Sequence, residues 1–125
     1  MINLQELAIR AGQEIRKIYD SQNYQVESKD DDSPLTTADL ASNRIINEAI
    51  AKQGFPILSE ENSEVPYAER KDWKEFFLVD PLDGTKEFLK GNGEFTVNAA
   101  LVEDGVPVVG VVAVPALDTW YVAAS

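Results

Sequence analysis

The sequence predicts an α+β fold in which two N-terminal helices pack on one face of a mainly antiparallel sheet. Three observations point to it: helical spacing of apolar residues up to residue 52, β-rich apolar runs in the second half, and an Asp-Gly pair between two of those runs. Helices followed by consecutive strands are the order of an α+β domain, not of alternating βαβ units. A length of 125 residues suggests one domain over residues 1–125.

The first helix is expected to end near residues 20–21. Apolar residues recur three or four positions apart along it, and charged residues take the opposite side. The apolar set is Leu4, Leu7, Ala8, Ala11, Ile15, Ile18 and Tyr19. A polar stretch follows. We expect the acidic run Asp30–Asp32 to be a solvated loop, because Pro34 disfavours helical backbone in the residue before it.

A second helix is expected over residues 38–52. Thr36 and Thr37 are candidate N-caps, because a threonine hydroxyl can accept a hydrogen bond from a free amide of the first turn. Gly54 is a candidate stop. The apolar side is assigned to Ala38, Leu40 or Ala41, Ile45, Ala49 and Ile50.

The second half of the chain is predicted to form strands. The apolar runs cover residues 55–58, 75–79, 95–102, 106–114 and 119–123, and the polar residues 62–72 form an excursion between two of them. The second run should stop at Asp80-Pro81, because proline cannot donate to a ladder. Asp104-Gly105 predicts a tight hairpin between the two longest runs.

The last run lies at the end of the sequence. A sheet that finishes there presents an unpaired edge, which can template pairing with another chain. We therefore expect self-association near Val122, and we expect the chain to be the N-terminal part of a longer protein.

The charge and composition of the chain limit the partners and the types of reaction that it can support. Lys and Arg number 11 and Asp and Glu number 22, a net charge of −11 that argues against a nucleic-acid polymer as partner. Without His or Cys, zinc sites, thiolate nucleophiles and triads with a histidine base are excluded. Carboxylates and hydroxyls remain, and they favour a hard cation such as Mg²⁺ or Ca²⁺. No apolar run is long enough for a transmembrane segment, and no signal peptide is evident; we expect a cytoplasmic protein and leave peripheral association at the inner membrane open.

The most informative stretch is residues 79–88. An apolar strand delivers Asp80 to its end, and Asp83 follows closely enough for a turn to aim both carboxylates at one point. With the Leu82 carbonyl and the Thr85 hydroxyl they make an all-oxygen set suited to Mg²⁺, and Gly84 leaves room for a phosphate. The alternative is a simple turn with a capping Asp, which the complete string disfavours.

Two further acidic positions are candidates. Glu60 and Glu61 follow a short apolar run, and one of them is a candidate metal ligand, although a solvated pair is the alternative. Asp39 is either a charge that favours the helix start or a residue that orients or deprotonates a water at the metal centre. Lys29 and Lys86 are surface lysines by default and phosphate contacts otherwise.

These residues resemble a known family. The strings at residues 33–39, 58–61, 78–88 and 92–98 are similar to those of the lithium-sensitive, magnesium-dependent phosphatase superfamily that includes inositol monophosphatase. Lys86-Glu87-Phe88 points to the 3'(2'),5'-bisphosphate nucleotidase branch, the CysQ-type enzymes of bacteria. The resemblance implies the N-terminal half of the layered sugar-phosphatase fold, because the family's chains are about twice as long and complete their metal cluster with a later Asp.

The resemblance also implies site roles. Mg²⁺, as two or three ions in the complete family site, would be held by Glu60, Asp80, the Leu82 carbonyl and Asp83. Asp39 and Thr85 would activate the attacking water. The substrate phosphate would lie against Glu60, Leu82, Asp83, Gly84 and Thr85.

The expected activity is removal of the 3'-phosphate from adenosine 3',5'-bisphosphate and from 3'-phosphoadenylyl sulfate, in sulfate assimilation. The alternatives are an inositol monophosphatase or sugar-bisphosphatase of the same superfamily, and a non-catalytic metal-binding fragment.

Overall fold

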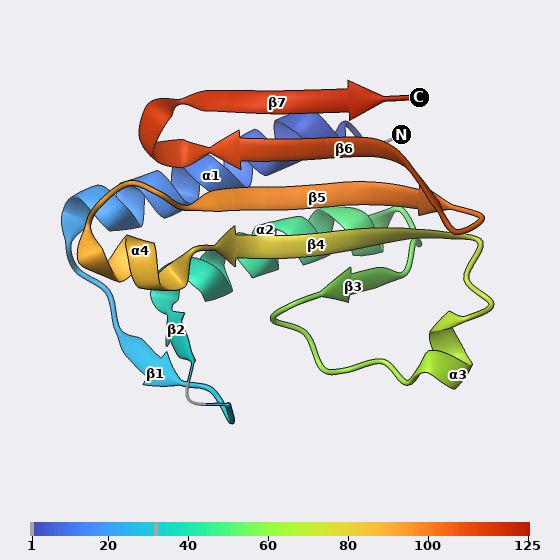
Figure 1. Cartoon of the computed structure of the whole chain (residues 1–125), viewed down its shortest axis with the longest axis horizontal. Coiled ribbons are helices and arrows are strands. Elements are labelled where there is room, and N and C mark those ends of the chain that lie inside the picture. The colour runs from blue at the N-terminus through green and yellow to red at the C-terminus, as the bar shows by residue number, and fades with distance from the viewer. Residues whose placement is uncertain (1, 32) are drawn as a thin grey trace.

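A five-stranded sheet backed by two helices forms the body of the protein (Figure 1). The computed structural model describes residues 2–31 and 33–125. Its helices are α1 (Leu4–Ser21), α2 (Thr37–Lys52), α3 (Tyr67–Arg70), α4 (Thr85–Lys90) and the 3₁₀ turn η1 (Pro115–Leu117). Its strands are β1 (Val26–Ser28), β2 (Pro34–Thr36), β3 (Ile57–Ser59), β4 (Glu75–Asp83), β5 (Thr96–Glu103), β6 (Val106–Val114) and β7 (Thr119–Ala124). The predicted α+β fold is confirmed.

The sheet has the order β3-β4-β5-β6-β7 and is mainly antiparallel, as expected. Only the pairing of β3 with β4 is parallel among the described strands. The hairpin at Asp104-Gly105 is confirmed. Both residues have positive φ, 49° and 79°, which suits a tight turn whose twist matches the strands.

The helices begin and end close to where the sequence places them. Asn3 caps α1 by accepting a hydrogen bond from the Glu6 amide at 3.1 Å. Thr36, not Thr37, caps α2 in a reciprocal capping box with Asp39, and Gly54 follows the helix with a φ of 78°.

The buried face of α2 differs from the prediction. Leu40 is 49% exposed, so its assignment to the apolar side is wrong, whereas Ala41, Ile45 and Ala49 are half-buried. The buried positions follow the four-residue repeat of a helix face, and two of them are polar because they bind the sheet and its loops. They are Ala38, Asp39, Ser42, Ile46 and Ile50.

Three local features depart from the sequence prediction. β4 does not stop at Asp80-Pro81 but continues to Asp83 through a β-bulge. Residues 26–28 and 34–36 form a small antiparallel hairpin, in which Pro34 sits at the start of a strand, a position that tolerates proline. The excursion contains the short helix α3. Asp30 and Asp31 are exposed as expected, and Asp32 lies outside the described residues.

An aromatic cluster anchors α4 to the end of α1. The rings of Phe88 and Phe95 are fully buried with centroids 5.2 Å apart, and Tyr19 lies 5.3 and 4.8 Å from them. Tyr24 meets Phe88 edge-on at 5.0 Å. Tilted and edge-on aromatic pairs are favourable beyond their buried area, so this cluster fixes the segment that follows β4.

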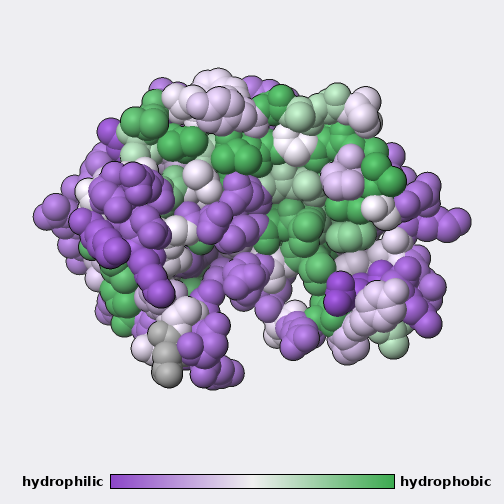
Figure 2. Space-filling model, viewed as in Figure 1, coloured by the Kyte–Doolittle hydropathy of each residue, from purple (hydrophilic) through white to green (hydrophobic). Residues whose placement is uncertain are grey.

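The sheet face away from α1 and α2 is apolar and uncovered by the described residues. Figure 2 shows hydrophobic side chains gathered over the strands on this face. Leu78, Val112 and Val122 are 38–47% exposed there. Strand β7 pairs only with β6 within residues 2–31 and 33–125, so self-association at this edge stays a prediction. Within the same residues, every helix is too short or too polar to cross a membrane.

Truncating Phe95 should destabilise the fold strongly. We expect Phe95→Ala to lower the free energy of unfolding by about 3–5 kcal/mol, because it removes a fully buried ring that packs against Phe88 and Tyr19. Leu40→Ala, on the exposed side of α2, should change it by less than about 0.5 kcal/mol. Urea denaturation measures both, and equal effects would contradict the assignment of the core.

Candidate functional site

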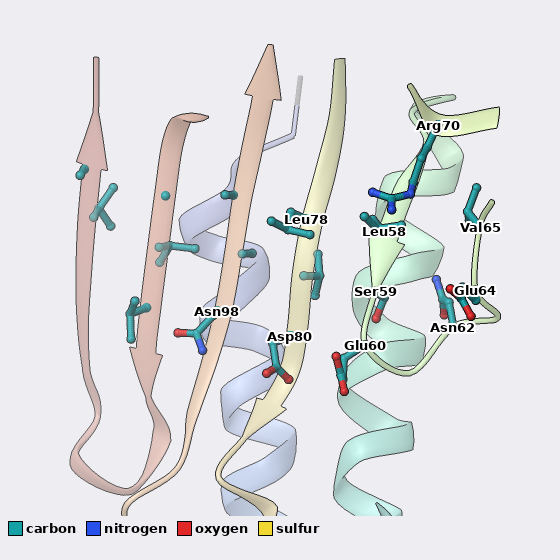
Figure 3. A pocket seen from close by; sticks show the side chains of 18 of the residues that line it. Leu58, Ser59, Glu60, Asn62, Glu64, Val65, Arg70, Leu78, Asp80 and Asn98 are labelled. Carbon is teal, nitrogen blue, oxygen red and sulfur yellow. The ribbon is translucent and has the colours of Figure 1, made fainter. Parts of the chain in front are cut away.

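The parallel pairing of β3 and β4 brings two acidic strand ends together. Ser59 is in register with Val79, and the Glu60 amide donates to the Val79 carbonyl at 3.1 Å. Because parallel strands finish at the same edge of a sheet, Glu60 and Asp80 emerge side by side. Leu58, Glu60 and Asp80 line the open face of the sheet (Figure 3).

A bulge in β4 adds Asp83 to this pair. Asp80 is opposite Asn98 and Asp83 is opposite Thr96, so β4 advances three residues while β5 advances two. Residues three apart in a regular strand point to opposite faces, and the extra residue cancels that alternation. The bulge therefore brings the two carboxylates together, a role that the sequence prediction gave to a turn. The Asn98 amide donates to Asp83 at 3.2 Å.

The surroundings of Asp80 disfavour the charged form of its carboxyl group. Burial, then the negative charges of Asp83 and Glu60, raise the pKa of Asp80 to about 6, although the Leu82 amide opposes them. The Oδ1 atom of Asp80 is buried and has no hydrogen-bond partner among residues 2–31 and 33–125. An unpartnered carboxylate oxygen beside two other acids is what a bound cation would satisfy.

Asp39 and Thr85 meet at the other side of the bulge. Asp39 has no exposed surface, and its Oδ2 accepts from the Thr36 amide at 2.8 Å and the Thr36 hydroxyl at 2.6 Å. Its Oδ1 accepts from the Thr85 hydroxyl at 3.0 Å. The charge of a buried carboxylate is costly unless hydrogen bonds stabilise it, and three do so here. Asp39 therefore reaches the site through Thr85.

Gly84 makes the junction between β4 and α4. Its φ of 94° disfavours other residues, and a Cβ there would lie 2.7 Å from the Glu94 carbonyl oxygen. Two independent constraints thus require glycine. The close approach that the structure shows is to this carbonyl, and the expected contact with a phosphate stays a prediction.

Glu61 pairs with Lys29. The Glu61 side chain is 4% exposed, and Lys29 donates to it from the loop after β1. Burial raises the pKa of Glu61 despite this partner. In Lys29 burial is the largest single effect and lowers the pKa of the amine, but the bond to Glu61 together with the negative charges of Glu61, Glu60 and Asp39 raises it overall. Of the two adjacent acids, Glu60 is the one that lines the open sheet face with Asp80.

The acidic strand ends border a groove of about 930 Å³ on the open sheet face. Figure 3 shows Glu60 and Asp80 at one end of it, Arg70 at the other, and Leu58 and Leu78 between them.

The donor set fits a hard divalent cation. Glu60, Asp80, Asp83 and the Leu82 carbonyl offer only oxygen, which suits Mg²⁺. In residues 2–31 and 33–125, no three acidic side chains lie close enough to hold a metal as they stand. Glu60 and Asp83 are exposed, so their side chains can rotate toward the buried Oδ1 of Asp80.

Several residues that shape the site escaped the sequence analysis. The buried Ser42 hydroxyl donates to the Pro81 carbonyl at 2.7 Å and holds the bulge. Asn98 holds Asp83, and Asn43 holds the end of β3 through Ser59. The helical repeat that joins Asp39, Ser42 and Asn43 on one side of α2 is the signal that could have found two of them. Lys86 is exposed, as predicted for a surface lysine.

Comparison with known proteins decides the family. A profile of the inositol monophosphatase family matches residues 1–125. The chain belongs to this family. It is 48% identical to the 3'(2'),5'-bisphosphate nucleotidase CysQ of Salmonella typhimurium, over 95% of this chain and 49% of the relative.

Solved structures agree with the fold. CysQ from Bacteroides thetaiotaomicron is 45% identical, with a TM-score of 0.78 over 95% of this chain and 43% of that one. The extragenic suppressor protein SuhB from Bartonella henselae is 34% identical, with a TM-score of 0.85 over 97% and 47%. The chain thus spans about half the length of the relatives it matches.

The stability of the metal-free chain should depend on the charge of Asp80. Its raised pKa means that the folded state binds more protons than the unfolded state between about pH 4 and pH 6. The contribution of Asp80 to stability therefore falls as pH rises through this window. We expect Asp80→Asn to raise the free energy of unfolding at pH 7 by about 1–2 kcal/mol and to leave it nearly unchanged at pH 4.

Urea denaturation at the two pH values in a chelating buffer measures this difference. Asp31→Asn is the control of opposite sign, because Asp31 is exposed and hydrogen bonds from Ser33 lower the pKa of its carboxyl. A variant at Asp80 that is less stable at pH 7 than the parent chain would contradict the assignment.

Proposed function

We propose that the whole protein is a magnesium-dependent phosphatase that removes the 3'-phosphate from adenosine 3',5'-bisphosphate, giving AMP and phosphate. The observation that supports this proposal most strongly is the hydrogen bond between the buried Asp39 and the Thr85 hydroxyl, beside the acidic strand ends. Relatives named 3'(2'),5'-bisphosphate nucleotidase support the substrate class. The second proposed substrate is 3'-phosphoadenylyl sulfate, and the proposed setting is sulfate assimilation in the cytoplasm.

Glu60, Asp80, the Leu82 carbonyl and Asp83 are the residues that would hold Mg²⁺. When bound, the cation neutralises phosphate oxygens and lowers the pKa of water. A cation at these residues would also let a chain with a net charge of −11 bind an anionic nucleotide. The unpartnered Oδ1 of Asp80 supports this assignment.

Thr85 is the residue that would orient the attacking water. Its hydroxyl hydrogen is donated to Asp39, which leaves the oxygen lone pairs free to accept a hydrogen bond from water. Asp39 has no exposed surface, so its part is to fix the hydroxyl and to favour proton movement toward Thr85. The water oxygen forms a bond to phosphorus while one of its protons passes toward Thr85 and Asp39. The bond from phosphorus to the 3'-oxygen breaks, and that oxygen takes a proton from solvent to become the hydroxyl of AMP.

Backbone amides at Gly84 and Thr85 are proposed to hold the phosphate. α4 is only six residues long, so the helix dipole is a small part of this argument. The left-handed conformation of Gly84 matters more, because it sets the direction in which the following peptide points.

A substrate panel tests the proposal. The whole protein, with Mg²⁺, is assayed for phosphate release from adenosine 3',5'-bisphosphate, 3'-phosphoadenylyl sulfate, inositol 1-phosphate and fructose 1,6-bisphosphate. We expect kcat/KM to be highest for the first two. Inositol phosphate as the best substrate would instead support the inositol monophosphatase alternative. No release from any compound would support a metal-binding protein without catalysis.

Removing the Thr85 hydroxyl should slow turnover more than it weakens metal binding. We expect Thr85→Ala to lower kcat by about 10²–10⁴-fold, because the water loses its positioned partner. Thr85→Ser is the matched control and should keep most activity, since it retains the hydroxyl. Steady-state kinetics at several Mg²⁺ concentrations separate the two effects, and full rescue of Thr85→Ala by high Mg²⁺ would reverse the assignment.

A further inference from the structure

A cluster of side-chain amides ties the end of β3 to α2. Asn43 is its centre: its Nδ2 donates to Asn62 at 3.0 Å, and its Oδ1 accepts from Ser59 at 2.6 Å and from Asn47 at 2.8 Å. Asn62 closes the ring by donating to Asn47 at 2.8 Å. Every amide in the ring therefore serves as both donor and acceptor.

The ring encloses the turn that carries Glu60. Ser59 and Asn62 flank this turn, and the backbone amide of Asn62 donates to the backbone carbonyl of Ser59 at 3.1 Å. Successive residues at a strand end point to opposite faces. Ser59 turns toward α2, so Glu60 is directed to the open face beside Asp80, as Figure 3 shows.

Local helix preference does not account for these asparagines. Asn43 and Asn47 lie in the middle of α2, where asparagine is among the weaker helix formers. Asn47 also donates to the Asn43 backbone carbonyl at 2.7 Å, a local bond of the kind that competes with helix geometry. Their tertiary bonds offset this cost.

We propose that the ring of Ser59, Asn43, Asn47 and Asn62 is a positioning device that aims Glu60 at the metal site. The inference rests on the proposed role of Glu60 as a metal ligand. Glu60 is exposed, and a long exposed side chain loses conformational entropy when it binds. A fixed backbone on both sides reduces the freedom that Glu60 must lose. The ring thus acts as the outer support of a metal ligand.

A double-mutant cycle tests this role in the whole protein. Mg²⁺ affinity is measured by titration calorimetry for the parent, Asn43→Ala, Glu60→Gln and the double variant. We expect Asn43→Ala to weaken Mg²⁺ binding about 10-fold in the parent. In the Glu60→Gln background it should weaken binding less than about twofold, because its effect passes through Glu60.

Asn3→Ala is the matched control. It removes the same side chain from the cap of α1, far along the chain from the site, and it also costs stability. We expect it to lower the melting temperature and to leave Mg²⁺ affinity within about twofold. Asn62→Ala lies outside the helix and repeats the cycle if Asn43→Ala does not fold.

The outcomes separate the two claims. Equal weakening by Asn43→Ala in both backgrounds, or weakening by Asn3→Ala as large as that by Asn43→Ala, would overturn the positioning role. If Glu60→Gln weakens Mg²⁺ binding but Asn43→Ala and Asn62→Ala do not, the positioning role is overturned and the proposed metal site stands. Unchanged Mg²⁺ affinity in Glu60→Gln would overturn both claims at Glu60.

Discussion

Asp39 is a buried carboxylate whose two oxygens serve different parts of the protein. One caps α2 through Thr36, and the other receives the hydroxyl of Thr85, 46 residues later in the chain. A buried charge is tolerated only while these bonds persist, so the start of α2 and the start of α4 must stay together. This single side chain therefore couples the helix layer to the candidate site.

The first half of α2 extends that coupling to the sheet. One side of the helix presents Asp39 to Thr85, Ser42 to the Pro81 carbonyl, and Asn43 to Ser59. In the second half of the helix Ile46 and Ile50 enter the core. The polar groups of the helix thus hold β3, β4 and the start of α4, and hydrogen bonds offset the cost of burying these groups. Because each bond goes to a different element, the acidic strand ends keep a defined spacing without bonding to one another.

The sequence predicted the structure correctly where a residue type has a single local role, such as a helix cap or a turn. Helix periodicity, the Thr36 cap, the Asp104-Gly105 turn and the strand runs predicted most of the fold. The acidic residues at the ends of β3 and β4 were found because the motif is compact. The bulge was not predictable, since only pairing with β5 reveals the extra residue. Ser42 and the asparagines of α2 were missed because a polar residue on a helix is usually solvated. Only the tertiary fold shows that their partners lie in β3, in β4 and in the loop after β3.

The central claim is that the ends of β3 and β4 form a divalent cation site beside Thr85. Anomalous diffraction from crystals of the whole protein grown with Mn²⁺ tests it directly, because manganese substitutes for magnesium at oxygen ligands and can be located without a model of the site. The account predicts a peak in contact with Asp80, with Glu60, Asp83 and the Leu82 carbonyl around it. An ordered peak elsewhere on the chain, with none at Asp80, would contradict it.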